Sequence, residues 1–237
     1  MTAPRAVLLD IGGIFHLPDH ATILGAFARG GFTADPDDLD RAHYVGAAQF
    51  RTDYDGDLPW AEYWEAYLGA YVEACGVPVE RRAEVLEHLR QEFSTAALWT
   101  RLIPGATDGL AALAATGVRL GVVSNADGMV ATRLREQEVL QVGPGAGVEV
   151  GCIIDSGAVG VQKPDARIFQ MGLLALDVAA EEVWYVGDMP GIDVVGARAA
   201  GLRPWVMDPF GLHGGADFER VASLSEVASL LPPTPEN

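Results

Sequence analysis

Cysteine is almost absent from this chain of 237 residues, which holds only Cys75 and Cys152. Two cysteines cannot build a disulfide scaffold, and their apolar neighbours favour buried, unreactive side chains. An apolar run long enough to span a membrane is also missing. Residues 1–5 lead straight into a hydrophobic strand, which leaves no room for a signal peptide. These absences predict a soluble protein of the reducing cytoplasm.

Basic residues are also scarce, with 16 lysines and arginines against 33 aspartates and glutamates, for a net charge of −17. A surface this acidic repels both the phosphate backbone of nucleic acids and anionic lipids. We therefore expect neither nucleic acid nor a membrane as a partner. Any phosphorylated ligand must be attracted by local cations, because the overall field of the protein repels it.

Three apolar segments each end on polar residues, and this pattern suggests a site. Residues 6–9 precede Asp10, residues 120–123 precede Ser124 and Asn125, and residues 183–186 precede Gly187 and Asp188. In an open parallel sheet, ligands bind beyond the carboxyl ends of the strands. We therefore expect these polar groups to converge on one small site, with Lys163 and Asp193 beside them.

The order of predicted elements indicates two kinds of region. Residues 17–98, called here the helical insert, show apolar residues at three- and four-residue spacing, and Asp35-Pro36 is typical of a helix start. From Pro104 onward, strands and helices alternate, which predicts an α/β fold with a doubly wound parallel sheet. The expected domains are a core of residues 1–16 and 99–237 and a helical domain of residues 17–98.

The pattern after Pro104 also predicts individual elements. The expected strands cover residues 118–123, 148–154, 183–186 and 203–207. The expected helices cover residues 129–138, 165–176, 194–200 and 224–231.

Four short motifs occur in order along the chain. They are Asp10-Ile11-Gly12-Gly13-Ile14, Ser124-Asn125, Lys163-Pro164 and Gly187-Asp188 followed by Asp193. Each motif alone is common, but together, at predicted strand ends, they resemble the haloacid dehalogenase superfamily. The resemblance is to its phosphatase-like members, which carry a helical cap inserted after the first strand, and it covers essentially the whole chain.

The resemblance implies a role for each motif. Asp10 would be the nucleophile that forms an aspartyl-phosphate. Mg²⁺ would be held by Asp10, the carbonyl of Gly12, Asp188 and, directly or through water, Asp193. Ser124, the backbone of Asn125 and Lys163 would bind the phosphoryl oxygens. These roles predict a Mg²⁺-dependent hydrolase of a small phosphorylated metabolite.

One residue departs from the family pattern. Many phosphatases of this superfamily carry a second aspartate, the general acid and base, two positions after the nucleophile, where this chain has Gly12. Loss of a positioned acid or base typically costs ~10²–10⁴-fold in rate. His16, His20 or a residue of the helical insert could substitute, and Asp127 also follows the second motif closely.

Two other functions stay open at this stage. A 2-haloacid dehalogenase would share the fold and the nucleophile but needs no metal, so the acidic pair Asp188 and Asp193 argues against it. A non-catalytic protein could keep the fold and the metal while lacking the acid at position 12. His43 and Arg51 lie in the helical insert, where selectivity usually resides in the family, but the sequence does not fix where they point.

Overall fold

The computed structural model describes residues 3–52 and 60–232. Six parallel strands form its main sheet, in the order β10-β9-β8-β1-β4-β7. Their bounds are β1 (Ala6–Leu9), β4 (Arg119–Ser124), β7 (Cys152–Asp155), β8 (Val183–Gly187), β9 (Arg203–Met207) and β10 (Glu219–Val221). The α/β fold with a doubly wound parallel sheet is therefore confirmed.

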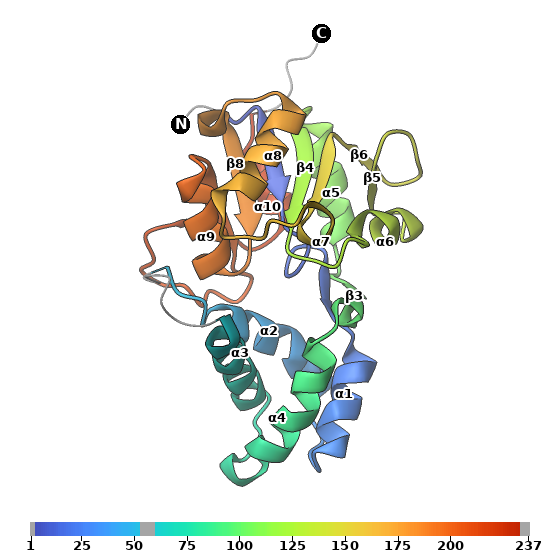
Figure 1. Ribbon diagram of the computed structural model, residues 1–237, viewed down its shortest axis with the longest axis vertical. Coiled ribbons are helices and arrows are strands. Elements are labelled where there is room, and N and C mark those ends of the chain that lie inside the picture. The colour runs from blue at the N-terminus through green and yellow to red at the C-terminus, as the bar shows by residue number, and fades with distance from the viewer. Residues whose placement is uncertain (1–2, 53–59, 233–237) are drawn as a thin grey trace.

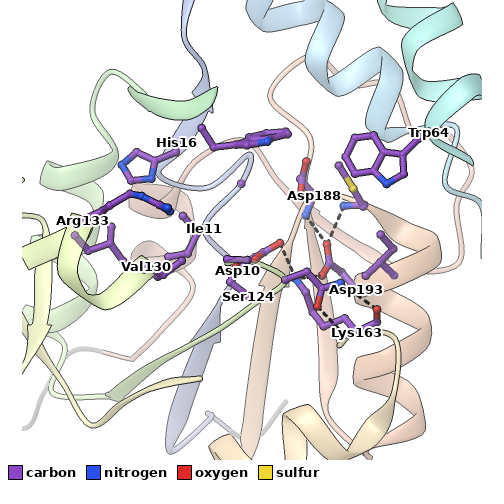
Figure 2. A pocket seen from close by; sticks show the side chains of 17 residues that line it. Asp10, Ile11, His16, Trp64, Ser124, Val130, Arg133, Lys163, Asp188 and Asp193 are labelled. Carbon is purple, nitrogen blue, oxygen red and sulfur yellow. Dashed lines mark hydrogen bonds and ion pairs between the residues drawn. The ribbon is translucent and has the colours of Figure 1, made fainter. Parts of the chain in front are cut away.

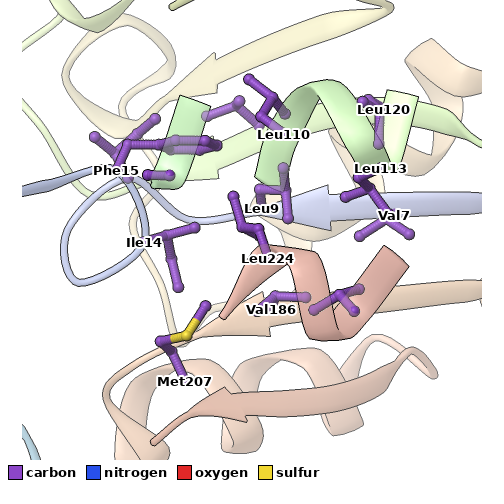
Figure 3. Close-up of a cluster of buried hydrophobic side chains, with 14 of the residues drawn as sticks. Val7, Leu9, Ile14, Phe15, Leu110, Leu113, Leu120, Val186, Met207 and Leu224 are labelled. Carbon is purple, nitrogen blue, oxygen red and sulfur yellow. The ribbon is translucent and has the colours of Figure 1, made fainter. Parts of the chain in front are cut away.

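Both faces of the sheet are covered, because the central strands are apolar on both sides. Alternate residues of a strand point to opposite faces. Val7 and Leu9 pack towards α5 (Ala106–Ala115) and α10 (Leu224–Ser229) (Figure 3). Ala6 and Leu8 pack on the other face, in a cluster that includes residues of α8 (Ala166–Leu176) and α9 (Pro190–Ala199).

Within residues 17–52 and 60–98 of the helical insert, four longer helices lie together at one end of the molecule, away from most of the sheet (Figure 1). They are α1 (His20–Arg29), α2 (Leu39–Ala47), α3 (Trp60–Ala74) and α4 (Val79–Phe93). Their inward faces form a separate apolar cluster that includes Phe27, Tyr67 and Tyr71. The helix start predicted at Asp35-Pro36 is confirmed, since the Asp35 carboxylate caps η1 (Pro36–Asp38) by accepting from the backbone amide of Asp37.

Two short sheets were not expected from the sequence. The first pairs β2 (His16–Pro18) with β3 (Trp99–Leu102), antiparallel, where the chain enters and leaves the insert. The second pairs β5 (Leu140–Val142) with β6 (Val148–Val150). The strand predicted at 148–154 is therefore two strands, β6 and β7, which separate at Gly151 because they pair with different neighbours.

The remaining elements are short or shifted at their ends. Helix α6 (Val130–Glu136) lies within its predicted range, and α9 begins four residues before the predicted start, with Pro190 in its first turn. The other short helices are α7 (Ser156–Val159), η2 (Ala96–Leu98) and η3 (Ala180–Glu182).

Two expectations drawn from absences can be compared with the structure. Cys75 and Cys152 are both buried and form no disulfide. Within residues 3–52 and 60–232, no helix combines the length and the apolar character that crossing a membrane requires.

Candidate active site

The carboxyl ends of β1, β4 and β8 lie side by side, because these strands are neighbours in the sheet. A pocket of about 140 Å³ opens there (Figure 2). Its lining includes all the residues that the sequence singled out for the site: Asp10, Gly12, Ser124, Asn125, Lys163, Asp188 and Asp193. The structure thus brings the four motifs together, while the role of each residue stays a prediction.

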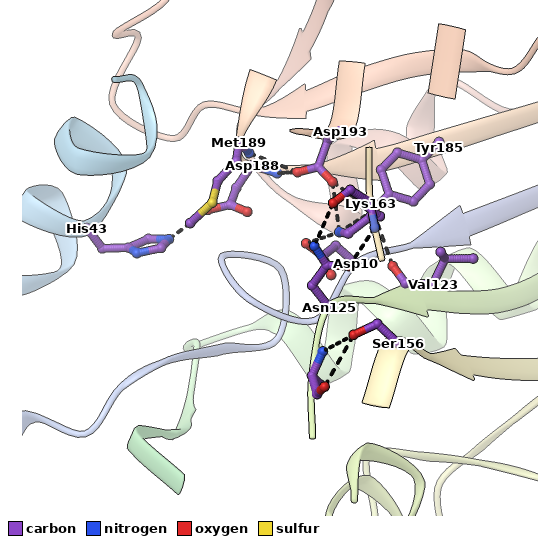
Figure 4. A network of polar contacts seen from close by, with 11 residues as sticks. Asp10, His43, Val123, Asn125, Ser156, Lys163, Tyr185, Asp188, Met189 and Asp193 are labelled. Carbon is purple, nitrogen blue, oxygen red and sulfur yellow. Dashed lines mark hydrogen bonds and ion pairs between the residues drawn. The ribbon is translucent and has the colours of Figure 1, made fainter. Parts of the chain in front are cut away.

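Lys163 is the centre of the polar contacts in this pocket. Its ammonium lies 2.7 Å from Asp10 Oδ2 and 2.8 Å from Asp193 Oδ1, and it donates to the hydroxyl of Tyr185 at 2.8 Å. The side chain of Asn125 fixes its backbone, accepting from the Lys163 amide at 2.7 Å and donating to its carbonyl at 3.0 Å (Figure 4). Asn125 therefore positions the lysine opposite the carboxylate of Asp10.

Asp193 has both of its carboxylate oxygens occupied by other groups of the protein. Oδ1 accepts from the ammonium of Lys163 and, at 2.9 Å, from the hydroxyl of Tyr185. Oδ2 accepts from the backbone amides of Asp188 and Met189, at 3.0 and 2.9 Å. A carboxylate with four donors is an anchor for its surroundings, which agrees better with an indirect than with a direct contact to a metal.

Asp10 differs, because its buried Oδ1 has no hydrogen-bond partner among the described residues. Leaving a buried carboxylate oxygen unpaired is costly, so a positive group is expected to contact it. Oxygen atoms of Asp10, Asp188 and Asp193 all lie within 4.8 Å of one another, and all three residues are buried. The carboxylates of Asp10 and Asp188, with the anchored Asp193 close by, fit a hard divalent cation such as Mg²⁺.

The electrostatics of the pocket support this interpretation. Burial raises the pKa of Asp10 to about 6, and the charges of Asp193 and Asp188 add to the effect against the opposing charge of Lys163. Burial also raises the pKa of Asp188. For Lys163, burial disfavours the charge, but the neighbouring carboxylates outweigh it and raise the pKa of the ammonium. The site therefore carries more negative charge than Lys163 alone stabilises.

His43 is a residue of the insert whose direction the sequence did not fix. It is fully buried, and its Nε2 lies 2.8 Å from Asp188 Oδ2 (Figure 4). Its Nδ1 lies 2.9 Å from the hydroxyl of Tyr67 on α3. The available signal was its place on the buried face of α2, beside Leu39 and Gly46, since a buried histidine needs polar partners.

The candidates for the missing acid and base separate in the structure. His16 lines the pocket, with its Nε2 2.6 Å from Gln137 Oε1. Because the Gln137 amide nitrogen donates to the carbonyl of Thr100, its Oε1 is an acceptor and Nε2 of His16 carries the hydrogen. His20 instead pairs with Asp40, outside the described lining of the pocket.

Several further side chains line the pocket without having been predicted, among them two tryptophans and an arginine. Trp64 and Trp99 contribute aromatic surface, and Arg133 contributes a cation that is paired with Asp127. On α3, Tyr67 is fully buried in the apolar cluster of the insert, and Trp64 packs partly buried against the same cluster while it also lines the pocket.

Curated relatives share part or most of this sequence. A phosphoserine phosphatase of Thermus thermophilus is 39% identical over 162 residues, which are 67% of this chain and 60% of the relative. A phosphoglycolate phosphatase of Rhodospirillum rubrum is 32% identical over 230 residues, 95% of this chain and 86% of the relative. A human haloacid dehalogenase-like hydrolase domain-containing protein 3 is 32% identical over 156 residues. The matches to the T. thermophilus and human proteins span about three fifths of those relatives' length.

Solved structures share the fold along almost the whole chain. The putative HAD-hydrolase YfnB of Bacillus subtilis, bound to magnesium, has a TM-score of 0.59 at 20% identity and covers 97% of this chain and 99% of its own. A 2-haloacid dehalogenase of Pseudomonas syringae has a TM-score of 0.52 at 22% identity, over 96% of this chain and 97% of its own. At these identities the structures establish the fold and leave the reaction open.

The family itself follows from the sequence profile and from the motifs that meet at the sheet edge. The profile of the haloacid dehalogenase-like hydrolases matches residues 5–201, a range that begins before Asp10 and ends after Asp193. With the four motifs lining one pocket of the expected fold, this chain belongs to the haloacid dehalogenase-like hydrolases.

Proposed function

We propose that this protein is a Mg²⁺-dependent phosphatase of small phosphorylated metabolites that works through an aspartyl-phosphate on Asp10. The observation that carries the proposal is the buried Oδ1 of Asp10, unpaired among the described residues, beside two further carboxylates and the ammonium of Lys163. Relatives named as phosphatases support the same reaction class. The acidic surface makes a small ester a better substrate than a nucleic acid.

Each residue has a part in the proposed reaction. A carboxylate oxygen of Asp10 attacks phosphorus, the bond to the leaving group breaks, and water later cleaves the aspartyl-phosphate. Lys163 and Ser124 hold the equatorial oxygens of the phosphoryl group, and Asn125 keeps Lys163 in place through its backbone contacts.

The proposed metal site consists of Asp10, Asp188 and the carbonyl of Gly12, with Asp193 acting through the residues it anchors. When bound, Mg²⁺ supplies positive charge that lowers the repulsion between the carboxylates and the phosphate. The raised pKa values of Asp10 and Asp188 agree with this need for a cation.

The helical insert is proposed to be a cap domain of residues 17–98 over a core of residues 1–16 and 99–237. Its Trp64 lines the pocket, so the insert contributes surface that faces a substrate. Covering the pocket would exclude water from the aspartyl-phosphate and strengthen local electrostatic interactions. We further propose a reducing compartment such as the cytoplasm, since both cysteines are unpaired.

The test is a panel of phosphate esters assayed with Mg²⁺, with EDTA and with 2-chloropropionate in place of the esters. We expect inorganic phosphate to be released with Mg²⁺, less with EDTA, and no chloride from 2-chloropropionate. Lys163→Met replaces the ammonium with an uncharged side chain of similar length, and we expect this variant to release no phosphate. Chloride release that EDTA does not affect would show a dehalogenase, and no release from any compound would support a non-catalytic protein.

A further inference from the structure

Helix α2 of the insert contacts both loops that carry the proposed metal ligands. His43 bonds to Asp188 at the end of β8, and the next residue, Tyr44, donates its hydroxyl to the carbonyl of Gly13 at 2.8 Å. Just beyond the helix, the carbonyl of Phe50 accepts from the amide of Gly191 at 2.6 Å. The insert is therefore connected by hydrogen bonds to the loops after β1 and β8.

The contact with Asp188 is isolated from water. The side chain of His43 is 0% exposed and that of Asp188 is 2% exposed. The imidazole is enclosed by the rings of Tyr44, Tyr67 and Trp99, whose centroids lie 4.9 to 5.9 Å away. A hydrogen bond in such surroundings is stronger than in water, and its loss leaves a buried acceptor unsatisfied.

The donor in this contact follows from the chemistry of the partners. An ionised carboxylate only accepts, so the hydrogen lies on Nε2 of His43 and is directed at Asp188 Oδ2. The hydroxyl of Tyr67 can then donate to Nδ1, which fixes the ring. This contact takes one oxygen of Asp188 and restricts the direction in which the carboxylate faces the other two aspartates.

We propose that His43 is a positioning residue that orients Asp188 for the metal, so that affinity for Mg²⁺ depends on the insert being seated on the sheet edge. The proposal rests on the proposed function, in which Asp188 is a metal ligand. Groups that orient metal ligands typically contribute about 10–100-fold to metal affinity. Linkage also requires the reverse effect, in which Mg²⁺ stabilises the seated insert by the same factor.

Direct titration with Mg²⁺ alone, by calorimetry and without substrate, tests the proposal. We expect His43→Leu, which removes the donor, to raise the Kd for Mg²⁺ by ~10–100-fold. In His43→Gln, the amide nitrogen can replace Nε2 as donor, so its Kd should stay within about threefold of the wild type. The control is His20→Asn, which breaks another histidine–aspartate pair of the insert, 2.8 Å long, and should leave the Kd unchanged.

Tyr67→Phe is a second variant for the case in which His43→Leu does not fold. It keeps the ring packing but removes the partner of Nδ1, and should raise the Kd for Mg²⁺ by about 10-fold, the lower end of the same range. Hydrogen exchange should also show that Mg²⁺ protects α2 in the wild type and not in His43→Leu.

The outcomes distinguish this inference from the proposed function. If folded His43→Leu binds Mg²⁺ as tightly as the wild type or more tightly, the positioning role is overturned and the metal site stays intact. If only Tyr67→Phe folds, the same result in that variant has the same meaning. A wild-type protein that binds no Mg²⁺ would overturn the metal site itself, and the inference with it.

Discussion

The sheet side and the insert side of the pocket differ in the kinds of side chains that form them. On the sheet side, charged groups hold one another in place: Lys163 has three partners, and both oxygens of Asp193 are occupied. On the insert side, Trp64 offers apolar surface to the pocket, and the polar contacts of His43 and Tyr44 lead to the loops beneath. The difference agrees with the proposal, in which the sheet edge performs the chemistry while the insert covers it and sets its geometry.

The largest effect should come from the sheet side. We expect Asp10→Asn to lower turnover by about 10⁴-fold or more, because it replaces the proposed nucleophilic carboxylate with a neutral amide. Asp188→Asn should mainly raise the Mg²⁺ concentration needed for half-maximal activity and lower the rate less, because in the proposed mechanism Asp188 holds the metal without attacking. Steady-state kinetics across a Mg²⁺ titration would separate the two. Near wild-type activity in Asp10→Asn would refute the assignment of the nucleophile.

Gly12 and Gly13, adjacent in the loop after β1, provide two alanine variants that can be compared. Gly13 has φ of 67°, and a Cβ there would lie 2.4 Å from Asp188 Cγ. A Cβ at Gly12 would meet only Trp99, at 3.5 Å, in ordinary contact. We expect Gly13→Ala to cost about 100-fold in kcat/KM through displacement of Asp188, and Gly12→Ala to cost far less. A loss in Gly13→Ala as small as that expected for Gly12→Ala would show that Asp188 tolerates the displacement.

The absence of an acidic side chain at position 12 leads to a prediction of an intermediate effect on turnover. Gly12 lacks the positive φ that would exclude a side chain, and a Cβ there makes only ordinary contacts, so the backbone can accept Gly12→Asp. On alkyl phosphates, which need a protonated leaving group, we expect turnover to rise on the order of 10-fold. On p-nitrophenyl phosphate the gain should be smaller, because p-nitrophenolate leaves without a proton. A wild-type rate that is independent of leaving-group pKa would instead indicate an existing acid, and His16 would be mutated first.

The smallest effect is expected from the insert side. Tyr44→Phe removes the hydroxyl that donates to the Gly13 carbonyl, and should lower the free energy of unfolding by about 1 kcal/mol. The control is Ser94→Ala, which removes an exposed hydrogen bond from the Ser94 hydroxyl to the Gln91 carbonyl within the insert and should lower the free energy of unfolding less. Denaturant unfolding with unchanged m-values would measure both. A larger loss in Ser94→Ala would argue against a tightly seated insert.

The same contrast explains what the sequence could predict. Strand ends such as those before Asp10 and Ser124 are visible as apolar runs, and a parallel sheet brings all of them to one edge. The site on the sheet side therefore follows from local pattern and topology. Helix α9 begins earlier than predicted because the hydrophobic pattern locates the first residue of a helix only approximately.

The insert side could not be predicted in this way. The sequence can place His43 on one helical face with Leu39 and Gly46, but which group of the sheet edge it contacts depends on how α2 docks, and a single sequence contains no direct sign of docking. The pairing of β2 with β3 depends on residues more than eighty positions apart in short, irregular segments. Arg133 and Trp64 reach the pocket for the same reason, through tertiary packing that periodicity does not specify.

The most direct test of the account is to trap the phosphorylated enzyme. Wild-type protein would be mixed with Mg²⁺ and p-nitrophenyl phosphate, quenched in acid within the first turnover, and mapped by mass spectrometry of its peptides. The account predicts a phosphoryl group on Asp10, and none in Asp10→Asn, with accumulation favoured by the missing acid and base at Gly12. Turnover without a phosphorylated residue, or a label on Ser124 in place of Asp10, would contradict it.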